Sequence, residues 1–569
     1  GRPSLQAPRG PQPEAPRPRR HAMAFTDYSE RASRMIRRWS GVRDPPRKPS
    51  QQQELPRVCV ARRPPSLWLP ALYRVALRLA SLWRRIVSLA PVAKLLCAPA
   101  AEDESSQPAP FQDEYVEPAR SIPVSDTCDV LVVGGGPAGL SAAVAAARAG
   151  ASTMLIERHG CFGGCITTVG METLGWYRYE GVVECETGIG MEMERMAARM
   201  GGTVKWPFNS SECLDADYFK IVADHLVSDA GVKPLLHTIV VEAIHEGGAL
   251  AGVIVENKSG RSAVRAKRVI DCTGDADVAY LAGARCTKRD RRERMGVSTV
   301  FSCSGVDKQA FIDYTETNPA TYKTWSRRGG EWCQQTADKE EHLRSPFLQE
   351  EFEKAIAAGV IPATPSNMDL GGSWSALSDA GEATNLNLVH QPGVDGTDAA
   401  ELTRAEMEGR AQTLHAIAAL KHAVPGFEKS KLRNFGMQVG VRDTRKIVGR
   451  YDLVGEDVRG EARFDDSVGI FPEFVDGYNI LILPTTGRYF QVPLRCMQSP
   501  DVDNLLVAGR CVAGDKVSHA AMRNMMACTV TGQAAGTAAA VSIREGTSTH
   551  HVPVDAVQRE LVQQGVRIS

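Results

Sequence analysis

Two side chains near the C-terminal end of the sequence, His519 and Arg523, could carry out acid–base chemistry and anion binding. They lie four residues apart in Gly-Asp-Lys-Val-Ser-His-Ala-Ala-Met-Arg, so a helix would place both on one face. The imidazole of His519 could act as a general acid or base, and the guanidinium of Arg523 could hold a carboxylate or an anionic cofactor. The alternative for His519 is a hydrogen-bonded structural histidine, and the sequence leaves both interpretations open.

A second group of charged residues, Arg442, Asp443 and Arg445, lies in Gly-Val-Arg-Asp-Thr-Arg-Lys. If both guanidinium groups faced one ligand, they could clamp an acidic substrate through paired hydrogen bonds. The same residues could instead form an internal ion-pair network, which is the favoured interpretation of the two.

The sequence contains 14 cysteines, which are scattered singly and lack the spacing of a zinc or iron–sulfur site. We therefore expect no metal centre, and reduced thiols in a reducing compartment. One close pair, Cys161 and Cys165, invites comparison with a redox-active disulfide. That function is disfavoured because the two residues straddle Gly163–Gly164, a doublet that we expect to face phosphate groups.

These side chains need a scaffold, and residues 129–157 indicate which one. An apolar run, Asp-Val-Leu-Val-Val, predicts a buried strand that enters the turn Gly-Gly-Gly-Pro-Ala-Gly. A helix is predicted over 140–148 and a second apolar strand over 153–156. This order of strand, glycine-rich turn, helix and strand is typical of a dinucleotide-binding site.

Each glycine of this turn has a distinct expected role. Gly134 makes the tight turn, Gly136 lets the backbone approach a pyrophosphate, and Gly139 allows helix and strand to pack closely. The helix N-terminus offers free N–H groups to the phosphates. Glu157 follows where a carboxylate can accept both ribose hydroxyls, which favours FAD or NAD over NADP. The Gly163–Gly164 doublet favours FAD, since it lets the backbone run close to a second part of a longer cofactor.

Further elements are predicted downstream of this site. Asp215 is placed to cap a helix that runs to Ala230. Apolar runs at 235–245, 250–256 and 263–271 predict a three-stranded antiparallel meander. A strong helix is predicted over 399–423, with Asp398 and Glu401 forming a capping box.

The order of these motifs resembles the glutathione-reductase-type FAD proteins, and more narrowly the FAD-dependent oxidoreductase family that includes the heterodisulfide reductase A-like proteins. The resemblance rests on Val-Val-Gly-Gly-Gly-Pro-Ala-Gly, Asp-Cys-Thr-Gly-Asp at 271–275, Gly-Val-Arg-Asp-Thr-Arg-Lys-Ile-Val-Gly at 440–449, Asn-Leu-Leu-Val-Ala-Gly-Arg at 504–510 and Thr-Gly-Gln-Ala-Ala-Gly-Thr at 531–537. It covers about residues 125–545. It implies an α/β fold with a Rossmann-like FAD-binding domain of three layers and an inserted, mixed α+β substrate domain.

The same resemblance implies how FAD is held. Gly274 and Asp275 would lie beside the pyrophosphate and ribitol, and a helix beginning near Thr531 would point its N-terminus at the flavin pyrimidine. A helix dipole there would stabilise the negative charge of a reduced flavin. The full set of expected FAD-binding residues is Gly134, Gly136, Pro137, Ala138, Gly139, Glu157, Arg158, Gly163, Gly164, Val241, Gly274, Asp275, Gly509, Arg510, Asp515, Gly532, Gln533 and Ala534.

The N-terminal part of the sequence differs in composition from the rest. The chain holds 67 Lys and Arg and 67 Asp and Glu, but residues 1–100 are strongly basic, so the remainder is acidic. An acidic body gives no reason to expect nucleic-acid binding, and no apolar stretch is long enough to span a membrane. An amphipathic helix predicted over 71–90 points to a transit sequence and an organellar location, mitochondrion or plastid. The alternative is a basic helix on a membrane surface or on the protein body.

The expected domains follow from these motifs. They are a largely disordered leader at 1–100, a linker at 101–125, an FAD-binding domain at 126–170, 213–299 and 491–545, a substrate domain at 171–212 and 300–490, and a C-terminal tail at 546–569.

The expected function is hydride transfer between flavin N5 and a small organic substrate that could be acidic, with His519, Arg523, Arg442 and Arg445 as candidate catalytic residues. No second glycine fingerprint stands out for NAD(P)H, so we expect oxygen, a quinone or an electron-transfer protein as the electron acceptor. The alternatives are an electron-transfer flavoprotein with iron–sulfur partners, a binding protein that kept the fold without turnover, and an NAD-dependent dehydrogenase. The sequence leaves the oligomeric state open.

Overall fold

The computed structural model describes residues 115–174, 188–205, 212–318, 347–374, 376–478, 480–482 and 487–569. Residues Ser121–Ser569 form one compact unit. The predicted helix over 71–90, the leader that contains it and most of the predicted linker lie outside the described residues. No helix in the described part of the chain is both long enough and apolar enough to cross a bilayer.

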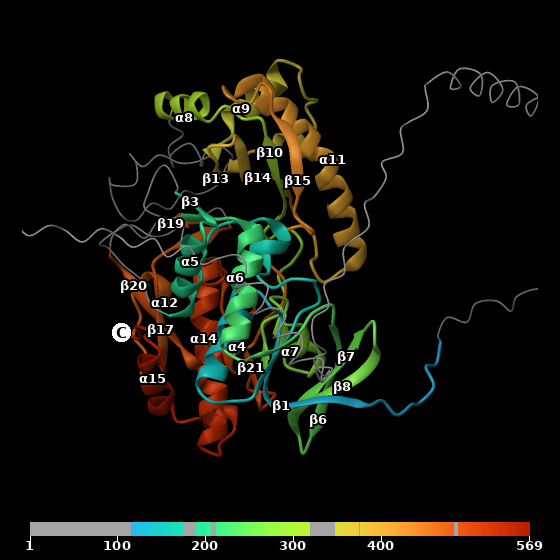
Figure 1. The fold of residues 1–569 in the computed structure, drawn as a ribbon, viewed down its shortest axis with the longest axis vertical. Coiled ribbons are helices and arrows are strands. Elements are labelled where there is room, and N and C mark those ends of the chain that lie inside the picture. Colours follow the sequence, from blue (N-terminus) through green and yellow to red (C-terminus); the bar gives the residue numbers. More distant parts are fainter. Residues whose placement is uncertain are drawn as a thin grey trace, which may run out of the picture. The chain divides into compact units, whose positions relative to one another are not determined.

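A parallel arrangement of strands forms the centre of this unit (Figure 1). The spatial order is β5 (Lys233–Leu235), β2 (Thr153–Ile156), β1 (Val124–Val133) and β8 (Gly260–Asp271), and β21 (Leu505–Val507) pairs with the end of β8. Val133 lies opposite both Ile156 and Asp271, so the carboxyl ends of three strands meet at one edge. Ligands of such sheets bind at this edge, where the direction of the strand order reverses.

The predicted meander is confirmed and extends this sheet. Strands β6 (Ile239–Glu246) and β7 (Ala249–Asn257) pair antiparallel with each other, and β7 pairs antiparallel with the first half of β8. The predicted helix over 215–230 is α6 (Ala216–Asp229), and the Asp215 carboxylate caps it by accepting hydrogen bonds from two backbone N–H groups.

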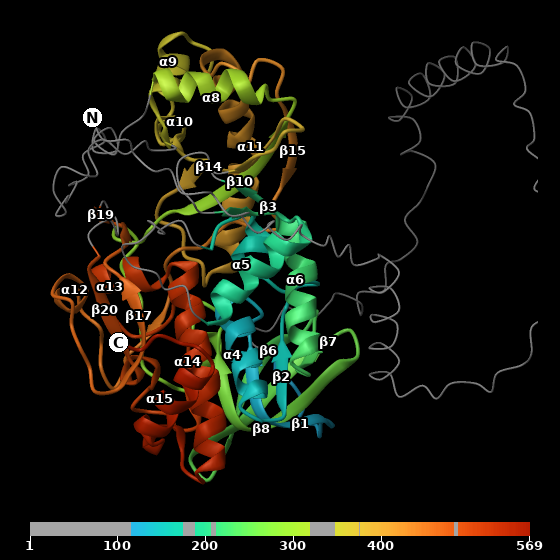
Figure 2. The same cartoon turned by 60° about the vertical axis from the view of Figure 1, so that its left-hand side comes forward.

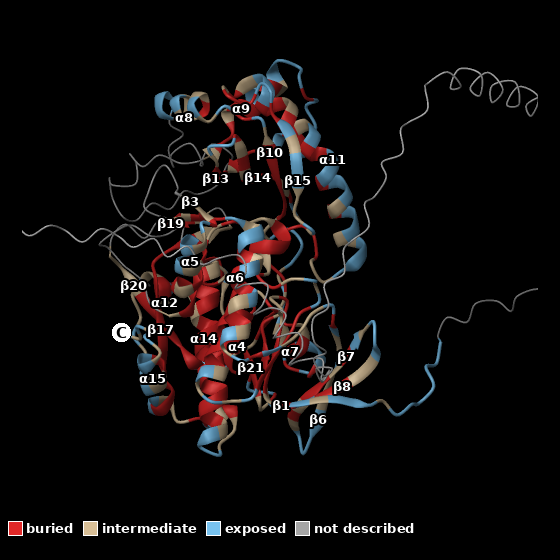
Figure 3. Cartoon of the chain, viewed as in Figure 1, coloured by how far each residue is buried: buried red, intermediate tan, exposed pale blue. Residues whose placement is uncertain are grey.

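Helix α4 (Pro137–Arg148) follows β1, and the long helix α14 (Met525–Arg544) lies beside it (Figure 2). An added Cβ at Gly532 or Gly536 would lie 2.1 Å from a backbone oxygen of α4, so a larger residue cannot fit at either position. The small residues of this segment are therefore explained by close packing of two helices. Figure 3 shows that α14 is buried along most of its length.

The start of α14 differs from the prediction. The helix begins at Met525 after an extended Asn524, six residues before Thr531, where the sequence placed it. The glycine and alanine pattern marks the contact with α4 rather than the helix N-terminus. Residues Gly532, Gln533 and Ala534 consequently lie in the second and third turns of α14, away from its N-terminal N–H groups.

A second hydrophobic core surrounds an antiparallel sheet. Strand β10 (Val297–Ser304) pairs with β14 (Glu382–Gln391) and β15 (Lys431–Phe435), and helix α11 (Ala399–Ala423) contacts β10 and β14. Large apolar side chains such as those of Phe301, Trp374 and Phe427 fill this core. The bounds of α11 are those that the sequence predicted.

The cap of α11 is confirmed in part. The Asp398 side chain accepts a hydrogen bond from the backbone N–H of Glu401 at 2.9 Å. The Glu401 carboxylate, however, accepts from the N–H of Asp395 at 2.8 Å rather than from that of Asp398. The N–H of Asp395, three positions before Asp398, therefore replaces the N–H of Asp398 as the donor to Glu401 that the predicted capping box requires.

The second core is smaller than the predicted substrate domain. Apolar side chains between Ile447 and Ile482 belong to the same core as the parallel sheet. Helix α5 (Ile189–Met200), which was also assigned to the substrate domain, contacts α4, α6 and α14. Both segments therefore belong to the core around the parallel sheet.

Further short helices and strands complete the described part of the chain. The helices are η2 (Cys165–Val169), α7 (Asp277–Leu281), α8 (Lys308–Thr317), α9 (Glu350–Ala357), α10 (Pro365–Met368), α12 (Gly455–Arg459), η5 (Leu494–Met497), α13 (Lys516–Met522), η6 (Thr549–His551) and α15 (Val554–Gln563). The strands are β3 (Thr203–Lys205), β4 (Glu212–Leu214), β9 (Cys286–Thr287), β11 (Phe347–Leu348), β12 (Gly372–Ser373), β13 (Ala376–Leu377), β16 (Lys446–Ile447), β17 (Ser467–Pro472), β18 (Val475–Gly477), β19 (Ile480–Ile482) and β20 (Tyr489–Pro493).

Candidate functional site

Five glycines line the carboxyl edge of the parallel sheet, and we call Gly134, Gly136, Gly139, Gly163 and Gly164 the glycine cradle. Gly134 has a φ of 99°, which L side chains rarely adopt, and it turns the chain out of β1. An added Cβ at Gly139 would lie 1.7 Å from the backbone oxygen of Gly134, so glycine is required there. The turn at Gly134 and the first turn of α4 can therefore pack this closely only if residue 139 is glycine.

The cradle leaves backbone groups open for a ligand. Gly136 is the N-cap of α4, no side chain caps this end, and Pro137 occupies the first turn. On the other side of the cradle, an added Cβ at Gly164 would lie 2.7 Å from Cα of Gly136. Two backbone segments thus meet at an uncapped helix N-terminus, which is the arrangement that favours a pyrophosphate.

Glu157 lies at the end of β2 and is 6% exposed. One carboxylate oxygen accepts a hydrogen bond from the N–H of Gly135 at 2.6 Å, and the other accepts from the N–H of His159 at 2.9 Å. Each oxygen retains a further lone pair, so the carboxylate can still accept ribose hydroxyls. Two further residues predicted to bind FAD lie in the same domain. Arg158 follows Glu157, and its guanidinium donates to the Gln438 side chain at 3.4 Å. Val241 lies within β6.

Arg510 and Asp275 form a buried ion pair of 2.7 Å next to the cradle. Thr444 joins them: its hydroxyl donates to Asp275 at 2.7 Å and accepts from Arg510 at 2.9 Å. Burial is the largest single influence and would lower the pKa of Arg510, but the charge of Asp275, its hydrogen bond and the neighbouring Cys165 and Cys511 together raise it. Gly274 has a φ of 80°, and an added Cβ would lie 3.0 Å from the Arg510 guanidinium.

The other residues predicted to hold FAD make contacts within the protein. The N–H of Gly509 donates to the Thr531 hydroxyl at 3.0 Å. Asp515 caps α13 and also accepts from the N–H of Gly455 at 2.9 Å. The amide oxygen of Gln533 accepts from the N–H of Ile189 at 2.9 Å. These contacts fold the surrounding loops, and a direct contact of these residues with a cofactor stays a prediction.

A cavity of about 180 Å³ is lined by residues next to the glycine cradle and by residues of the second sheet, and we call it the arginine cavity. The start of α14 contributes Asn524 and Met525 to its lining, so the positive end of a 20-residue helix faces it. The cavity is also lined by Arg442, Arg510, Arg523, Asp476, Cys165, Ser298, Asn387 and Trp374.

Arg442 is the cation of this cavity that has no acidic partner among the described residues. Its guanidinium donates to the carbonyl of Gly296 at 2.8 Å and to the side chain of Asn387 at 3.2 Å, and both acceptors are neutral. Burial, and next the charge of Arg523, lower the pKa of Arg442 to about 10, while the charges of Asp476 and Cys165 partly oppose the shift, so the group stays protonated at neutral pH. Arg523 is paired, because it donates to Asp476 at 3.0 Å.

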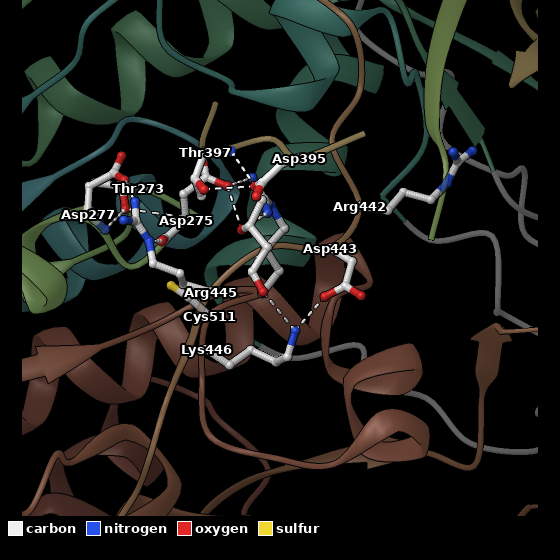
Figure 4. A network of polar contacts seen from close by, with 12 residues as sticks. Thr273, Asp275, Asp277, Asp395, Thr397, Arg442, Asp443, Arg445, Lys446 and Cys511 are labelled. Atoms are coloured by element: carbon white, nitrogen blue, oxygen red, sulfur yellow. Dashed lines mark hydrogen bonds and ion pairs between the residues drawn. The ribbon is translucent and has the colours of Figure 1, made fainter. Parts of the chain in front are cut away.

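The residues around Arg442 divide into two groups. Asp443 and Lys446 form an ion pair whose side chains are 0% and 2% exposed, and the Tyr478 hydroxyl donates to Asp443 at 2.7 Å. Arg445 pairs with Asp277 and donates to the carbonyl of Asp275 at 2.9 Å. In Figure 4 the side chain of Arg442 points away from this network. The network interpretation therefore fits Asp443 and Arg445, and substrate binding fits Arg442 alone.

His519 is 4% exposed and is absent from the lining of the arginine cavity. Its Nε2 lies 3.2 Å from the carbonyl of Arg442 and 3.7 Å from a carboxylate oxygen of Asp443. Burial, and next the charge of Lys446, lower the pKa of His519 well below its usual range. These contacts favour the structural interpretation of His519, which holds the backbone of Arg442, and they disfavour proton exchange with a ligand.

Cys161 and Cys165 are both free thiols. Cys161 lies 3.7 Å from the Thr167 hydroxyl, whereas Cys165 lines the arginine cavity. Burial raises the pKa of Cys165, which makes it a poor nucleophile at neutral pH. Within the described ranges, no cluster of His, Cys, Asp or Glu side chains could hold a metal ion.

Sequence analysis missed the residues that the second core brings to the arginine cavity, notably Ser298, Trp374 and Asn387. They lie on or next to strands β10, β12 and β14 and belong to no motif. Polar residues at alternating positions of otherwise apolar strands were the available signal, since such positions point to one face of a sheet.

A second cavity of about 140 Å³ shares Val169 with the arginine cavity, and Glu172 lines it. The Glu172 carboxylate accepts hydrogen bonds from the Thr384 hydroxyl and from the N–H of Ala216. Burial raises the pKa of Glu172 to about 7, although both hydrogen bonds oppose the shift.

A family model described as FAD dependent oxidoreductase matches residues 129–561, and the chain belongs to this family. The expected enzyme class and cofactor, FAD, are thereby confirmed, together with an α/β fold in which a Rossmann-like sheet is accompanied by a separate antiparallel sheet. The glycine cradle fits FAD, because added side chains would fill the space beside the uncapped end of α4.

Individual relatives match more weakly. A thiamine thiazole synthase from Methanococcus aeolicus is 31% identical over 180 residues, which make up 30% of this chain and 61% of that protein. A geranylgeranyl bacteriochlorophyll reductase-like protein from Thermoplasma acidophilum is 16% identical, with 77% of this chain and 82% of that chain covered and a TM-score of 0.37. An anhydrotetracycline hydroxylase from Streptomyces rimosus is 11% identical, with 77% and 66% covered and a TM-score of 0.39. None of these three similarities is to a heterodisulfide reductase.

Proposed function

Starting from its membership of the FAD-dependent oxidoreductases, we propose that this protein transfers a hydride between FAD and a small organic acid bound in the arginine cavity. The glycine cradle, Glu157, and the Arg510–Asp275 pair hold the cofactor, and the cavity beside them takes the substrate. A small cavity next to a cofactor, with a few placed polar groups, is the usual form of such a site.

The charge of Arg442 is the observation that carries the proposed substrate class. It lines the cavity, bonds only to neutral acceptors in the described part of the chain and stays protonated at neutral pH. A half-buried cation that forms no ion pair of its own is costly unless a ligand supplies the opposite charge. A carboxylate answers this need, and the planar guanidinium offers it two parallel donors.

The remaining side chains of the cavity limit what the rest of the substrate can be. Arg523 is neutralised by Asp476, so we assign one carboxylate to the substrate rather than two. Trp374 and Asn387 add apolar area and a hydrogen-bonding group. The cavity of about 180 Å³ restricts the ligand to a small molecule.

When bound, FAD supplies a two-electron acceptor or donor for this reaction. The N-terminus of α14, where Asn524 and Met525 line the cavity, presents free N–H groups and a positive dipole end. Negative charge that develops in the cavity is stabilised there. His519 serves this site indirectly, because it fixes the carbonyl of Arg442.

Reduction of FAD by small acids tests this function. The full-length chain is loaded with FAD, and loss of the oxidised-flavin absorbance is followed without oxygen after addition of lactate, mandelate, alanine or phenylalanine. Benzyl alcohol and 1,2-propanediol are the matched compounds that lack a carboxylate. We expect at least one acid to reduce FAD and the neutral compounds to react more slowly by about 100-fold, the value of a charged hydrogen-bonded pair of about 3 kcal/mol.

The variant R442M separates substrate binding from cofactor binding. It should retain bound FAD and lose about 100-fold in the efficiency of reduction by the acid, since its volume is similar and its charge is gone. Equal reduction by neutral and acidic compounds, or an unaffected R442M, would contradict the proposed substrate class. Reoxidation of the reduced protein by oxygen, menadione or a redox protein then identifies the acceptor class. Co-purified iron–sulfur proteins, with no reduction by any acid, would favour the electron-transfer alternative.

A further inference from the structure

We propose that Ser298 and His390 form a proton path out of the arginine cavity, an inference that rests on the function proposed above. Ser298 lines the cavity, and its hydroxyl oxygen lies 2.9 Å from Nδ1 of His390. Neither residue belongs to a sequence motif, and the pair is distinct from His519 on α13.

Strand β10, strand β14 and the segment that contains Gly440 together fix the position of the Ser298 hydroxyl. Ser298 in β10 lies directly opposite His390 in β14. Its backbone N–H donates to Gly440 at 3.0 Å, and its carbonyl accepts from Gly440 at 2.7 Å. Side chains directly opposite each other on antiparallel strands share a face of the sheet. The hydroxyl and the imidazole are therefore held in place before any ligand binds.

The pair is adjacent to the proposed anion site. Arg442 donates to the carbonyl of Gly296, two residues before Ser298 on the same segment. A carboxylate held by Arg442 therefore brings the rest of a small acid near the Ser298 hydroxyl. An α-hydroxy acid would present its hydroxyl group within the same small cavity.

Oxidation of such an acid requires removal of a proton as well as a hydride. The substrate O–H bond breaks and its proton goes to the Ser298 oxygen, while the Ser298 proton passes to Nδ1 of His390 and forms an imidazolium. The alcohol carbon gives up a hydride, with its two electrons, and becomes a ketone; FAD, when bound, would supply the two-electron acceptor for that hydride. Ser298 ends the step neutral, so charge and atoms balance.

The two histidines near the cavity differ in their access to water. His390 is half-buried, and we assign to its imidazole the release of the proton to solvent. His519 is 4% exposed and bonds to the Arg442 carbonyl. Ser298 is the catalytic residue of the path, since it touches the substrate, and His390 acts through Ser298.

Rapid-reaction measurements on the full-length, FAD-loaded chain test the path, with lactate and mandelate as probes. We compare S298A, H390N and S302A with the wild-type protein. Asparagine at 390 can still accept a hydrogen bond from Ser298 but cannot take up a proton. Ser302 lies on the same strand, is 8% exposed and lines the second cavity instead, so S302A is the matched control.

We expect S298A and H390N to lower the limiting rate of FAD reduction by about 100-fold, the usual size of an acid–base contribution. The half-saturating acid concentration should change less than about threefold because Arg442 still holds the carboxylate, and S302A should match the wild-type protein. A wild-type rate in H390N would reduce His390 to a structural role and overturn the path, as would an unaffected S298A. If neither lactate nor mandelate reduced the FAD bound to the wild-type protein, the proposed substrate class would be overturned, and the proton path with it.

Discussion

The glycine cradle and the arginine cavity lie next to each other but are built in opposite ways. The cradle is made of backbone from two short stretches of sequence, and what matters there is the absence of side chains. The cavity is lined by side chains from segments as distant as Cys165, Ser298, Arg442 and Met525. Under the proposed function, binding of the cofactor would thus depend on space, whereas binding of the substrate would depend on the placement of charge.

The difference predicts which changes each region tolerates. A backbone oxygen cannot move away from an added methyl group without disrupting the turn. The cradle therefore cannot relax at a glycine whose nearest neighbour is such an oxygen. A side-chain network can be replaced if charge and volume are replaced together. The expected effects range from loss of the fold to a selective loss of cofactor affinity.

The substitution G139A should have the largest effect, because the added Cβ would lie 1.7 Å from the carbonyl oxygen of Gly134. We expect a loss of more than about 3 kcal/mol in the free energy of unfolding, and no bound FAD. Denaturant titration measures the first and visible absorbance the second. The control for the free energy of unfolding is G136A in the same turn, where φ is −73° and the nearest atom to the added Cβ lies 3.7 Å away. A folded, yellow G139A protein would show that the cradle can relax after all.

The substitution K446M should cost about 3–5 kcal/mol in stability, because it leaves the Asp443 carboxylate buried without its cation. The double variant D443N/K446M should recover much of that loss, since both charges are then gone. Urea denaturation of the single and double variants measures the difference. If the double variant were as unstable as K446M, the side-chain network would be as intolerant as the cradle.

Glu172 should make stability depend on pH. Its pKa is raised from 4.5 to about 7 by burial, so the folded state holds a proton that the unfolded chain releases. This contribution is fully present below about pH 4.5 and is lost as the pH rises to about 7, with at most about 3 kcal/mol lost by pH 8.

The variant E172Q removes this titration and should flatten the stability profile between about pH 5 and 8, as measured by denaturant titration at each pH. The control is E382Q, since Glu382 lines the same second cavity but is more exposed and paired with Arg433. An E172Q profile as steep as that of the wild-type protein would assign the pH dependence to another group.

The substitution G136A should have the smallest effect on folding and a selective effect on the cofactor. The nearest atom to the added Cβ is Cα of Gly164 at 3.7 Å, an ordinary contact, so stability should change by less than about 1 kcal/mol. The methyl group occupies the space assigned to the pyrophosphate, so the Kd for FAD should rise at least about tenfold. Fluorescence titration with FAD measures this. Unchanged affinity would place the pyrophosphate elsewhere.

Much of the cofactor region could be predicted from sequence, because its determinants are local. The glycine spacing at 134–139, the acid at 157 and the meander each depend on residues close together in the chain, and the same is true of the helix over 399–423 in the second core. The start of α14 was missed because Gly532, Gln533 and Ala534 were assigned to a cofactor, whereas Gly532 and Gly536 serve the contact with α4. Helix–helix contacts depend on a distant partner that no local pattern identifies.

The sequence alone predicted the FAD-binding class of fold, because a turn that excludes side chains requires glycines at fixed positions. The sequence also places Arg442 and Arg445 in one motif, but it cannot separate their roles. Tertiary packing makes Arg442 face the cavity while Arg445 pairs with Asp277. The same holds for His519, which is enclosed, and for Ser298 and His390, which meet across two strands. Charge and proton chemistry depend on burial and on partners, and both arise when remote segments pack together.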